Sequence, residues 1–228
     1  MKNKKHVLKK IIDAKIPNYP WPHMIIDNFL PKDLYDGIVD EVSKFTTSDK
    51  LKLYNIRAYH IYVNKSISLF PNSPYLQEYY KILIDEEILE TLVKKLSLTE
   101  TPKDFYSELG MFTQGFNYQE IHPDRSDKAI TMLHYLADEG DDELLGTFMY
   151  DPCADGDKLD VFKDRLKIAP YIPNCVLFFA PRDEEKFKTL HCMANNSKET
   201  FLRKSLQNFW IKEPSDWTKD PQTGRIKL

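Results

Sequence analysis

The second half of the sequence is divided into short apolar or alternating segments, and this rhythm constrains the fold more than any other feature. From Asp104 onward the segments recur about every ten to fifteen residues, and clusters of Gly, Pro, Asn and Asp separate them. Regularly spaced short strands are typical of an all-β sandwich or jelly roll, and they argue against a parallel α/β sheet. The expected strands cover residues 105–114, 117–122, 128–137, 145–150, 165–172, 174–181, 187–193 and 200–212.

Helical patterns dominate the first half. Pro31 suits the first turn of a helix, where a missing N–H is harmless. That helix has an apolar stripe at helical spacing, formed by Leu34, Ile38, Val42 and Phe45. A second helical region begins at Ser73-Pro74, and its expected buried face consists of Leu76, Tyr80, Leu83, Ile88, Leu92 and Leu96.

The remaining segments of the first half complete the predicted organisation. Residues 24–30 are expected to form a short strand and residues 52–70 to be extended, whereas residues 1–20 are expected to form a loosely attached basic arm. We therefore expect one domain over residues 1–228. Its parts are an N-terminal arm and helical buttress (1–103), a β core (104–213) and a C-terminal tail (214–228).

Composition excludes several classes of protein. The net charge of −3 gives no general basic field, so nucleic acid held by charge alone is not an expected partner. No apolar run reaches the roughly 18 residues that a membrane span needs. Three cysteines without a C-x-x-C pair suit a reducing compartment. Because only Ile11-Ile12 follow the basic N-terminus as an apolar stretch, we expect no signal peptide and a cytoplasmic protein.

One histidine–aspartate motif in the β half points to metal chemistry. His122 and Asp124 are separated by one residue, and such residues of an extended segment project to the same side. His191, in a later expected strand, can supply a third ligand. Two histidines and one carboxylate on a β scaffold form the facial triad of non-haem Fe(II) oxygenases, which leaves metal positions open.

Simpler interpretations exist for these residues and for Arg203, which lies twelve residues after His191. His122 could be a solvated loop histidine, Asp124 could form a surface ion pair with Arg125, and Arg203 could be a surface cation. The flanks of Arg203 instead predict a buried strand. Cys192 follows His191 directly, and because adjacent strand residues point to opposite faces, the two cannot act together as a thiol nucleophile.

The order and spacing of motifs along most of the chain resemble those of the Fe(II)/2-oxoglutarate-dependent dioxygenases, specifically their prolyl-4-hydroxylase-like branch. The matching features are the opening 20–30 (PWPHMIIDNFL), His122-x-Asp124, the strand 131–136 (TMLHYL), the strand 173–179 (PNCVLFF), His191, and Arg203-Lys204-Ser205. The resemblance implies a mainly β fold with N-terminal helices, namely a double-stranded β-helix of the jelly-roll or cupin-like type. One departure is that Leu145-Gly146 stands where the branch usually has a Gly-Gly pair.

The resemblance also implies roles for individual residues. His122, Asp124 and His191 would bind Fe(II), with 2-oxoglutarate as cosubstrate together with O₂, and with activity that responds to ascorbate. Residues expected to bind the cosubstrate are Arg203, through a bidentate pair with its distal carboxylate, and Ser205, Tyr135 and Thr131 on the same faces.

The expected function is hydroxylation of an unactivated C–H bond, with succinate and CO₂ as coproducts. A prolyl or other peptidyl residue is the first choice of substrate, and a free amino acid, small metabolite or nucleobase is the alternative. Arg57 and Tyr59 are expected to reach the substrate, because their segment mixes aromatic and polar side chains. A rival from another class is a non-oxidative metal-binding cupin, which has no reason to place Arg203-x-Ser205 shortly after the last ligand.

Overall fold

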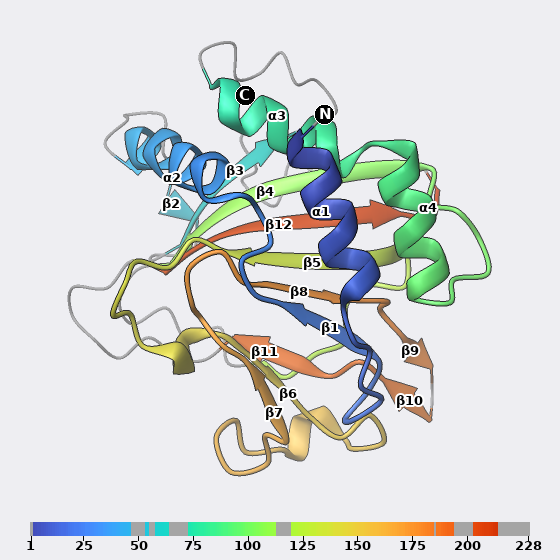
Figure 1. Cartoon of the computed structure of the whole chain (residues 1–228). Coiled ribbons are helices and arrows are strands. Elements are labelled where there is room, and N and C mark those ends of the chain that lie inside the picture. Colours follow the sequence, from blue (N-terminus) through green and yellow to red (C-terminus); the bar gives the residue numbers. More distant parts are fainter. Residues whose placement is uncertain are drawn as a thin grey trace.

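Two antiparallel sheets face each other beneath a layer of helices (Figure 1). The computed structural model describes residues 2–46, 53–54, 58–63, 73–112, 120–184, 186–193 and 203–213. The larger sheet has the order β1-β8-β5-β12-β4-β3-β2 and the smaller one has the order β11-β6-β7. A separate two-stranded ribbon pairs β9 (Asp183–Glu184) with β10 (Phe187–Lys188).

The strand bounds agree with most of the predicted rhythm. The expected strand 117–122 is the exception: its described residues 120–122 form only an isolated bridge at His122, and residues 117–119 lie outside the described part. The larger sheet contains β1 (His23–Ile26), β2 (Leu53–Tyr54), β3 (Ala58–Val63), β4 (Asp104–Phe112), β5 (Lys128–Tyr135), β8 (Val176–Phe179) and β12 (Arg203–Ile211). The smaller sheet contains β6 (Thr147–Met149), β7 (Lys167–Ala169) and β11 (His191–Met193). The expected mainly β, jelly-roll fold with N-terminal helices is confirmed, while the segment 187–193 divides into β10 and β11.

Alternation along β12 separates a helix-facing surface from an interior surface. Leu206 and Trp210 belong to the large apolar core that the helices cover. Arg203, Ser205 and Phe209 point the other way, into the space between the two sheets, and all three are buried. The outer face of the larger sheet therefore carries the main apolar core, while Arg203 and Ser205 lie on its interior face.

Four helices form the covering layer: α1 (Lys2–Asp13), α2 (Lys32–Thr46), α3 (Pro74–Leu83) and α4 (Glu86–Lys95). In the first predicted helix, Leu34, Ile38 and Val42 are buried as expected. The side chain of Phe45 lies outside the described part. The second predicted region is two helices, because Asp85 caps a new N-terminus by accepting a hydrogen bond from the Glu87 N–H at 3.1 Å. All six residues of its expected face are buried.

The predicted loose N-terminal arm is wrong. Residues 2–13 form α1, whose Val7 and Ile11 are fully buried one turn apart. Lys4 pairs with Asp85 at 2.7 Å and with Glu87 at 2.9 Å, at the start of α4. The many lysines concealed the apolar face through which α1 packs on the core. None of the helices in the described ranges has the length and apolar character that a membrane crossing requires.

Helix α3 begins against α2 at an unusually close contact. The Glu41 carboxylate accepts hydrogen bonds from the Tyr75 N–H at 3.1 Å and the Leu76 N–H at 2.9 Å. It thus accepts from two of the backbone N–H groups in the first turn of α3, which have no partner within the helix. Ser73, the residue before the helix, makes no capping hydrogen bond with its side chain. A Cβ on Gly37 would lie 2.4 Å from the Tyr75 ring, so glycine is needed there for space.

Replacing Gly37 by Ala should destabilise the protein by about 1–3 kcal/mol, because the added methyl group would displace the Tyr75 ring. In a Tyr75→Ala background the same change should stabilise it by about 0.5–1 kcal/mol, since alanine is the better helix former. Urea unfolding of the four proteins measures both effects. An equal cost in the two backgrounds would show that the ring contact is not the constraint.

Candidate metal centre

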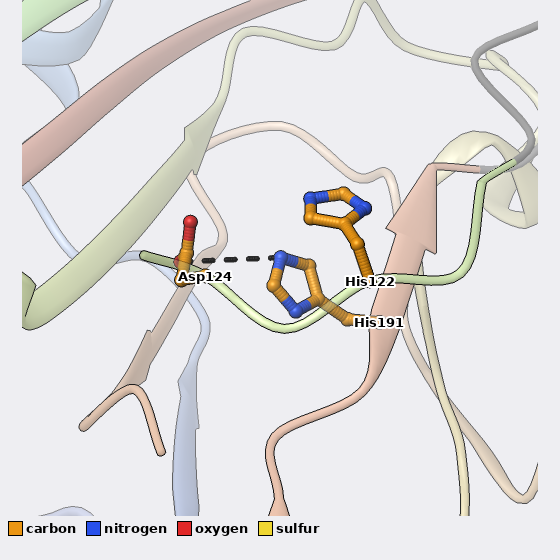
Figure 2. Close-up of side chains that lie close together, drawn as sticks. All are labelled: His122, Asp124 and His191. Carbon is orange, nitrogen blue, oxygen red and sulfur yellow. Dashed lines mark ion pairs between the residues drawn. The ribbon is translucent and has the colours of Figure 1, made fainter. Parts of the chain in front are cut away.

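Two backbone hydrogen bonds join the segments that carry the two candidate ligand histidines. The His122 N–H donates to the His191 carbonyl and the His191 N–H donates to the His122 carbonyl, each at 3.0 Å. The rings consequently lie side by side, with centroids 4.7 Å apart. One ligand atom each from His122, Asp124 and His191 lie within 4.8 Å of one another (Figure 2). The structure therefore brings together the three residues that the sequence singled out.

Both histidines present the same ring nitrogen to the cluster. His122 Nδ1 lies 2.9 Å from the Glu120 carbonyl, and His191 Nδ1 lies 2.9 Å from the Thr189 carbonyl. A carbonyl oxygen can only accept, so each Nδ1 carries the proton and each Nε2 keeps a lone pair for a metal. Burial, and then the neighbouring His122, lower the pKa of His191 to about 4. His191 is thus neutral at neutral pH, as a metal ligand must be.

The Asp124 carboxylate is held on both oxygens by side chains of β5. The Thr131 hydroxyl donates to Oδ2 at 2.6 Å, and the Lys128 ammonium forms an ion pair with Oδ1. Burial alone would raise the pKa of this carboxyl, but the charge of Lys128, the charge that His191 acquires at low pH and the two hydrogen bonds lower it to about 2. Asp124 Oδ2 lies 3.9 Å from His191 Nε2, which leaves the pair open for an ion (Figure 2).

A small apolar core stabilises the ligand segments from outside. The loop after β6 covers the outer face of the smaller sheet, where Ile121 and Leu190 pack with Phe148, Tyr150 and Cys192. Ile121 and Leu190 directly precede the two ligand histidines in the sequence. Cys192 is fully buried, as expected of a small core residue.

Arg203 occupies the interior of the barrel, and its side-chain contacts are unusual for a buried cation. It is 3% exposed, donates from Nε to the Leu145 carbonyl at 2.7 Å, and lies 3.4 Å from the Ser205 hydroxyl. The rings of Phe112, Tyr135 and Tyr171 surround the guanidinium, with centroids 5.5–5.6 Å away. Within the described part of the chain, no carboxylate lies at ion-pair distance from it.

The remaining predicted site residues differ in where they lie. Tyr135 is buried, and its hydroxyl donates to Thr147 at 2.7 Å, which joins the two sheets beside Arg203. The Thr131 hydroxyl is directed at Asp124. Arg57 lies outside the described residues. Tyr59 has only its backbone described, in β3 opposite Met111, so its contact with substrate stays a prediction.

Two site features were missed or left open by sequence reasoning. Lys128 was missed because a lysine in an alternating strand is normally assigned to the surface, and only its spacing from Asp124 hinted at a contact. The second feature is Leu145-Gly146, which replaces the Gly-Gly pair usual in the resembled branch. The surroundings of each residue explain why a large side chain fits at the first position and none fits at the second. The Leu145 side chain is buried in the core between the sheets, whereas a Cβ on Gly146 would lie 1.8 Å from the Ala169 carbonyl oxygen.

The fold is shared with oxygenases of known structure. A prolyl-4-hydroxylase from Pseudomonas putida is similar at a TM-score of 0.58 and 14% identity, over 92% of this chain and 99% of that chain. A prolyl hydroxylase from Trichoplax adhaerens, in complex with a hypoxia inducible factor peptide fragment, has a TM-score of 0.58 and 12% identity over 92% and 89%. A rice dioxygenase for auxin oxidation has a TM-score of 0.57 and 12% identity over 93% and 79%. A scan of protein-family models and a search of curated proteins found no match.

These similarities confirm the expected fold. The structural similarity extends over more than nine-tenths of this chain in each of the three comparisons.

Replacing Gly146 by Ala should destabilise the protein. The methyl group would collide with backbone, and the turn that presents the Leu145 carbonyl to Arg203 would have to shift. Because the overlap is with backbone, we expect a cost of about 3 kcal/mol in urea unfolding, clearly above that of the control. Gly140→Ala is the control: it lies in the preceding loop with open space around it, and its φ of 86° alone costs about 1 kcal/mol. Equal effects of the two substitutions would refute the packing argument.

Proposed function

We propose that this protein is an Fe(II)- and 2-oxoglutarate-dependent oxygenase that hydroxylates an unactivated C–H bond. The observation that carries the proposal is the combination, within one barrel, of a His–Asp–His cluster and a buried arginine that has no carboxylate partner in the described chain. Either feature alone fits several kinds of protein. Together they provide a site for a divalent metal and a site for an anion.

The donor set of the cluster fits Fe(II). Two neutral imidazoles and one ionised carboxylate form the set that non-haem Fe(II) oxygenases use, and it leaves coordination positions for other ligands. His122, Asp124 and His191 would hold the ion. Their orientation is already fixed by carbonyls 120 and 189 and by Thr131. Such outer contacts determine which atoms face the metal.

The surroundings of Arg203 fit a dicarboxylate cosubstrate. A buried guanidinium without a counter-ion is costly unless an anion joins it. Nε is used by the Leu145 carbonyl, while the terminal nitrogens form the planar fork that matches a carboxylate. Ser205 and the Tyr135–Thr147 pair lie beside it as further polar groups. We assign 2-oxoglutarate to this space, with its distal carboxylate on Arg203.

The division of labour between metal and protein follows from these positions. When bound, iron with 2-oxoglutarate and O₂ would supply the oxidation, with succinate and CO₂ as coproducts. The protein would fix the ligand geometry and neutralise the distal carboxylate at Arg203. Its aromatic walls of Phe112, Tyr135 and Tyr171 would exclude water around that charge. An ascorbate requirement is part of the same proposal.

For the substrate we propose a prolyl or other peptidyl residue. The Trichoplax adhaerens neighbour, solved with a peptide fragment, supports this class, and the rice neighbour for auxin oxidation supports a small molecule as the alternative. Arg57 and Tyr59 remain the proposed substrate contacts. The three cysteines are free thiols, which supports a reducing compartment such as the cytoplasm as the place of action.

A non-oxidative cupin is the rival, and Arg203 argues against it. A protein that only binds metal gains nothing from a cation buried in the barrel interior. Succinate release from 2-oxoglutarate by the Fe(II)-loaded protein, screened over peptides, free amino acids and nucleosides, would test both the reaction and the substrate class.

His191→Ala should abolish Fe(II) binding and leave the fold intact, since the remaining two ligands cannot hold the ion tightly. Anaerobic calorimetry with Fe(II) measures the affinity, and circular dichroism checks the fold. His6→Ala, which removes a histidine from α1, is the control and should bind Fe(II) normally. Full affinity in the His191 variant would place the metal elsewhere.

Arg203→Ala should weaken binding of 2-oxoglutarate to the metal-loaded protein by about 2–5 kcal/mol, because a buried carboxylate loses its bidentate partner. Arg203→Lys should recover only part of this, as an ammonium cannot form the fork. Calorimetry with the Mn(II)-loaded protein avoids turnover. Arg165→Ala, which removes a guanidinium placed 4.8 Å from the Phe148 ring, is the matched control. Unchanged binding in the Arg203→Ala protein would put the anion site elsewhere.

A further inference from the structure

The candidate metal centre contains a positive charge that the proposed chemistry does not use. Lys128 stands at the start of β5, and its side chain is only 9% exposed. Its ammonium group forms an ion pair with Asp124 Oδ1 and lies 3.8 Å from the centre of the Phe209 ring. Lysine is rarely buried unless paired. This one is paired with a residue whose expected partner is a metal.

The two carboxylate oxygens of Asp124 contact different partners. Oδ2 is the oxygen 3.9 Å from His191 Nε2, and it accepts the Thr131 hydroxyl. Oδ1 takes the Lys128 ammonium. An ion between the two histidines and Asp124 would meet Oδ2, which has a second lone pair. Lys128 can therefore keep its contact with Oδ1 while a metal is bound, and the ammonium would remain in the immediate surroundings of the ion.

This contact changes the charge of the centre. As metal ligands the two histidines would be neutral, so the carboxylate would carry the one negative charge of the ligand set. Lys128 cancels that charge, so a divalent ion held there would retain its full double charge. Because the groups are buried, the interaction is weakly screened. A more positive centre holds a cation less tightly and attracts an anionic ligand more strongly.

We infer that Lys128 sets the charge of the metal centre. Its positive charge lowers the affinity for the divalent ion and raises the affinity for the anionic chelator that binds to that ion. The inference rests on the proposed function, since the chelator is taken to be 2-oxoglutarate. Phe209 stabilises the ammonium in this position through a cation–π contact. Lys128 is a positioning and charge-setting residue here and does not itself react.

The test compares Lys128→Met with the wild-type protein, because methionine keeps the apolar stem against Phe209 and removes the charge. Calorimetry with Co(II) alone should show about tenfold tighter metal binding in the variant. Titration of the Co(II)-loaded protein with 2-oxoglutarate should show about tenfold weaker binding. Imidazole, a neutral metal ligand, should bind the two loaded proteins nearly equally.

Three further variants separate charge from geometry. Lys128→Arg keeps the charge and should resemble the wild-type protein in both titrations. Thr131→Val removes an uncharged donor that orients the same carboxylate, so the loss of orientation should weaken Co(II) binding, the opposite of the shift expected for Lys128→Met. Lys32→Met removes an 87% exposed lysine from α2 and should change neither affinity.

Opposite shifts of the two affinities in Lys128→Met support the inference. A fall in both would mean that Lys128 only orients Asp124, and no change in either would mean that its charge does not reach the metal; both results overturn the inference while leaving the oxygenase proposal standing. A wild-type protein that binds no Co(II) would overturn the proposed function and this inference together.

Discussion

The candidate metal centre depends on an isolated bridge of two hydrogen bonds between the backbones of His122 and His191. His191 belongs to the smaller sheet, where β11 pairs with β6, whereas His122 lies outside the named strands, in the described loop that begins at residue 120. The bridge holds this loop against the sheet edge. Ile121 and Leu190 pack into the small apolar core on the outer face of the smaller sheet, and these contacts stabilise the bridge. The geometry of a polar site is thus stabilised largely by burial on the opposite face of the same backbone.

Two buried cations divide the interior of the barrel into regions of different electrostatic character. Lys128 is paired with Asp124 and therefore needs no further anion. Arg203 has carbonyl, hydroxyl and aromatic neighbours but no carboxylate among the described residues. A folded protein tolerates such an imbalance where a bound anion removes it, since the cost of burying the charge is then recovered in binding. The contrast between the two residues is stronger evidence for an anion site than the burial of Arg203 alone.

The sequence predicted the fold well where local patterns determine structure. Strand rhythm located the β core, and helical spacing located the buried positions of α2, α3 and α4. It failed for α1, because Val7 and Ile11 are too few to stand out among lysines. The triad was predicted because His122 and Asp124 share one side of an extended segment. The contact of Lys128 with Asp124, however, depends on how the loop between them folds back onto β5, and no local pattern encodes that path.

The order of strands explains why the anion site and the fold form together. In the larger sheet, β1, β8 and β5 form one group and β4, β3 and β2 form another, and β12 lies between them. This strand is the last of those described, yet it pairs with β4 along its whole length and with β5 along most of it. Its outward residues Leu206 and Trp210 complete the helix-covered core, while Arg203 and Ser205 face the interior. Until β12 inserts, β5 and β4 each lack the strand that joins the two groups. Pairing between segments that are far apart in the sequence is slow to form. The arginine that would anchor the cosubstrate is therefore on the strand that joins the two groups, so a chain can present this anion site only after the sheet is complete.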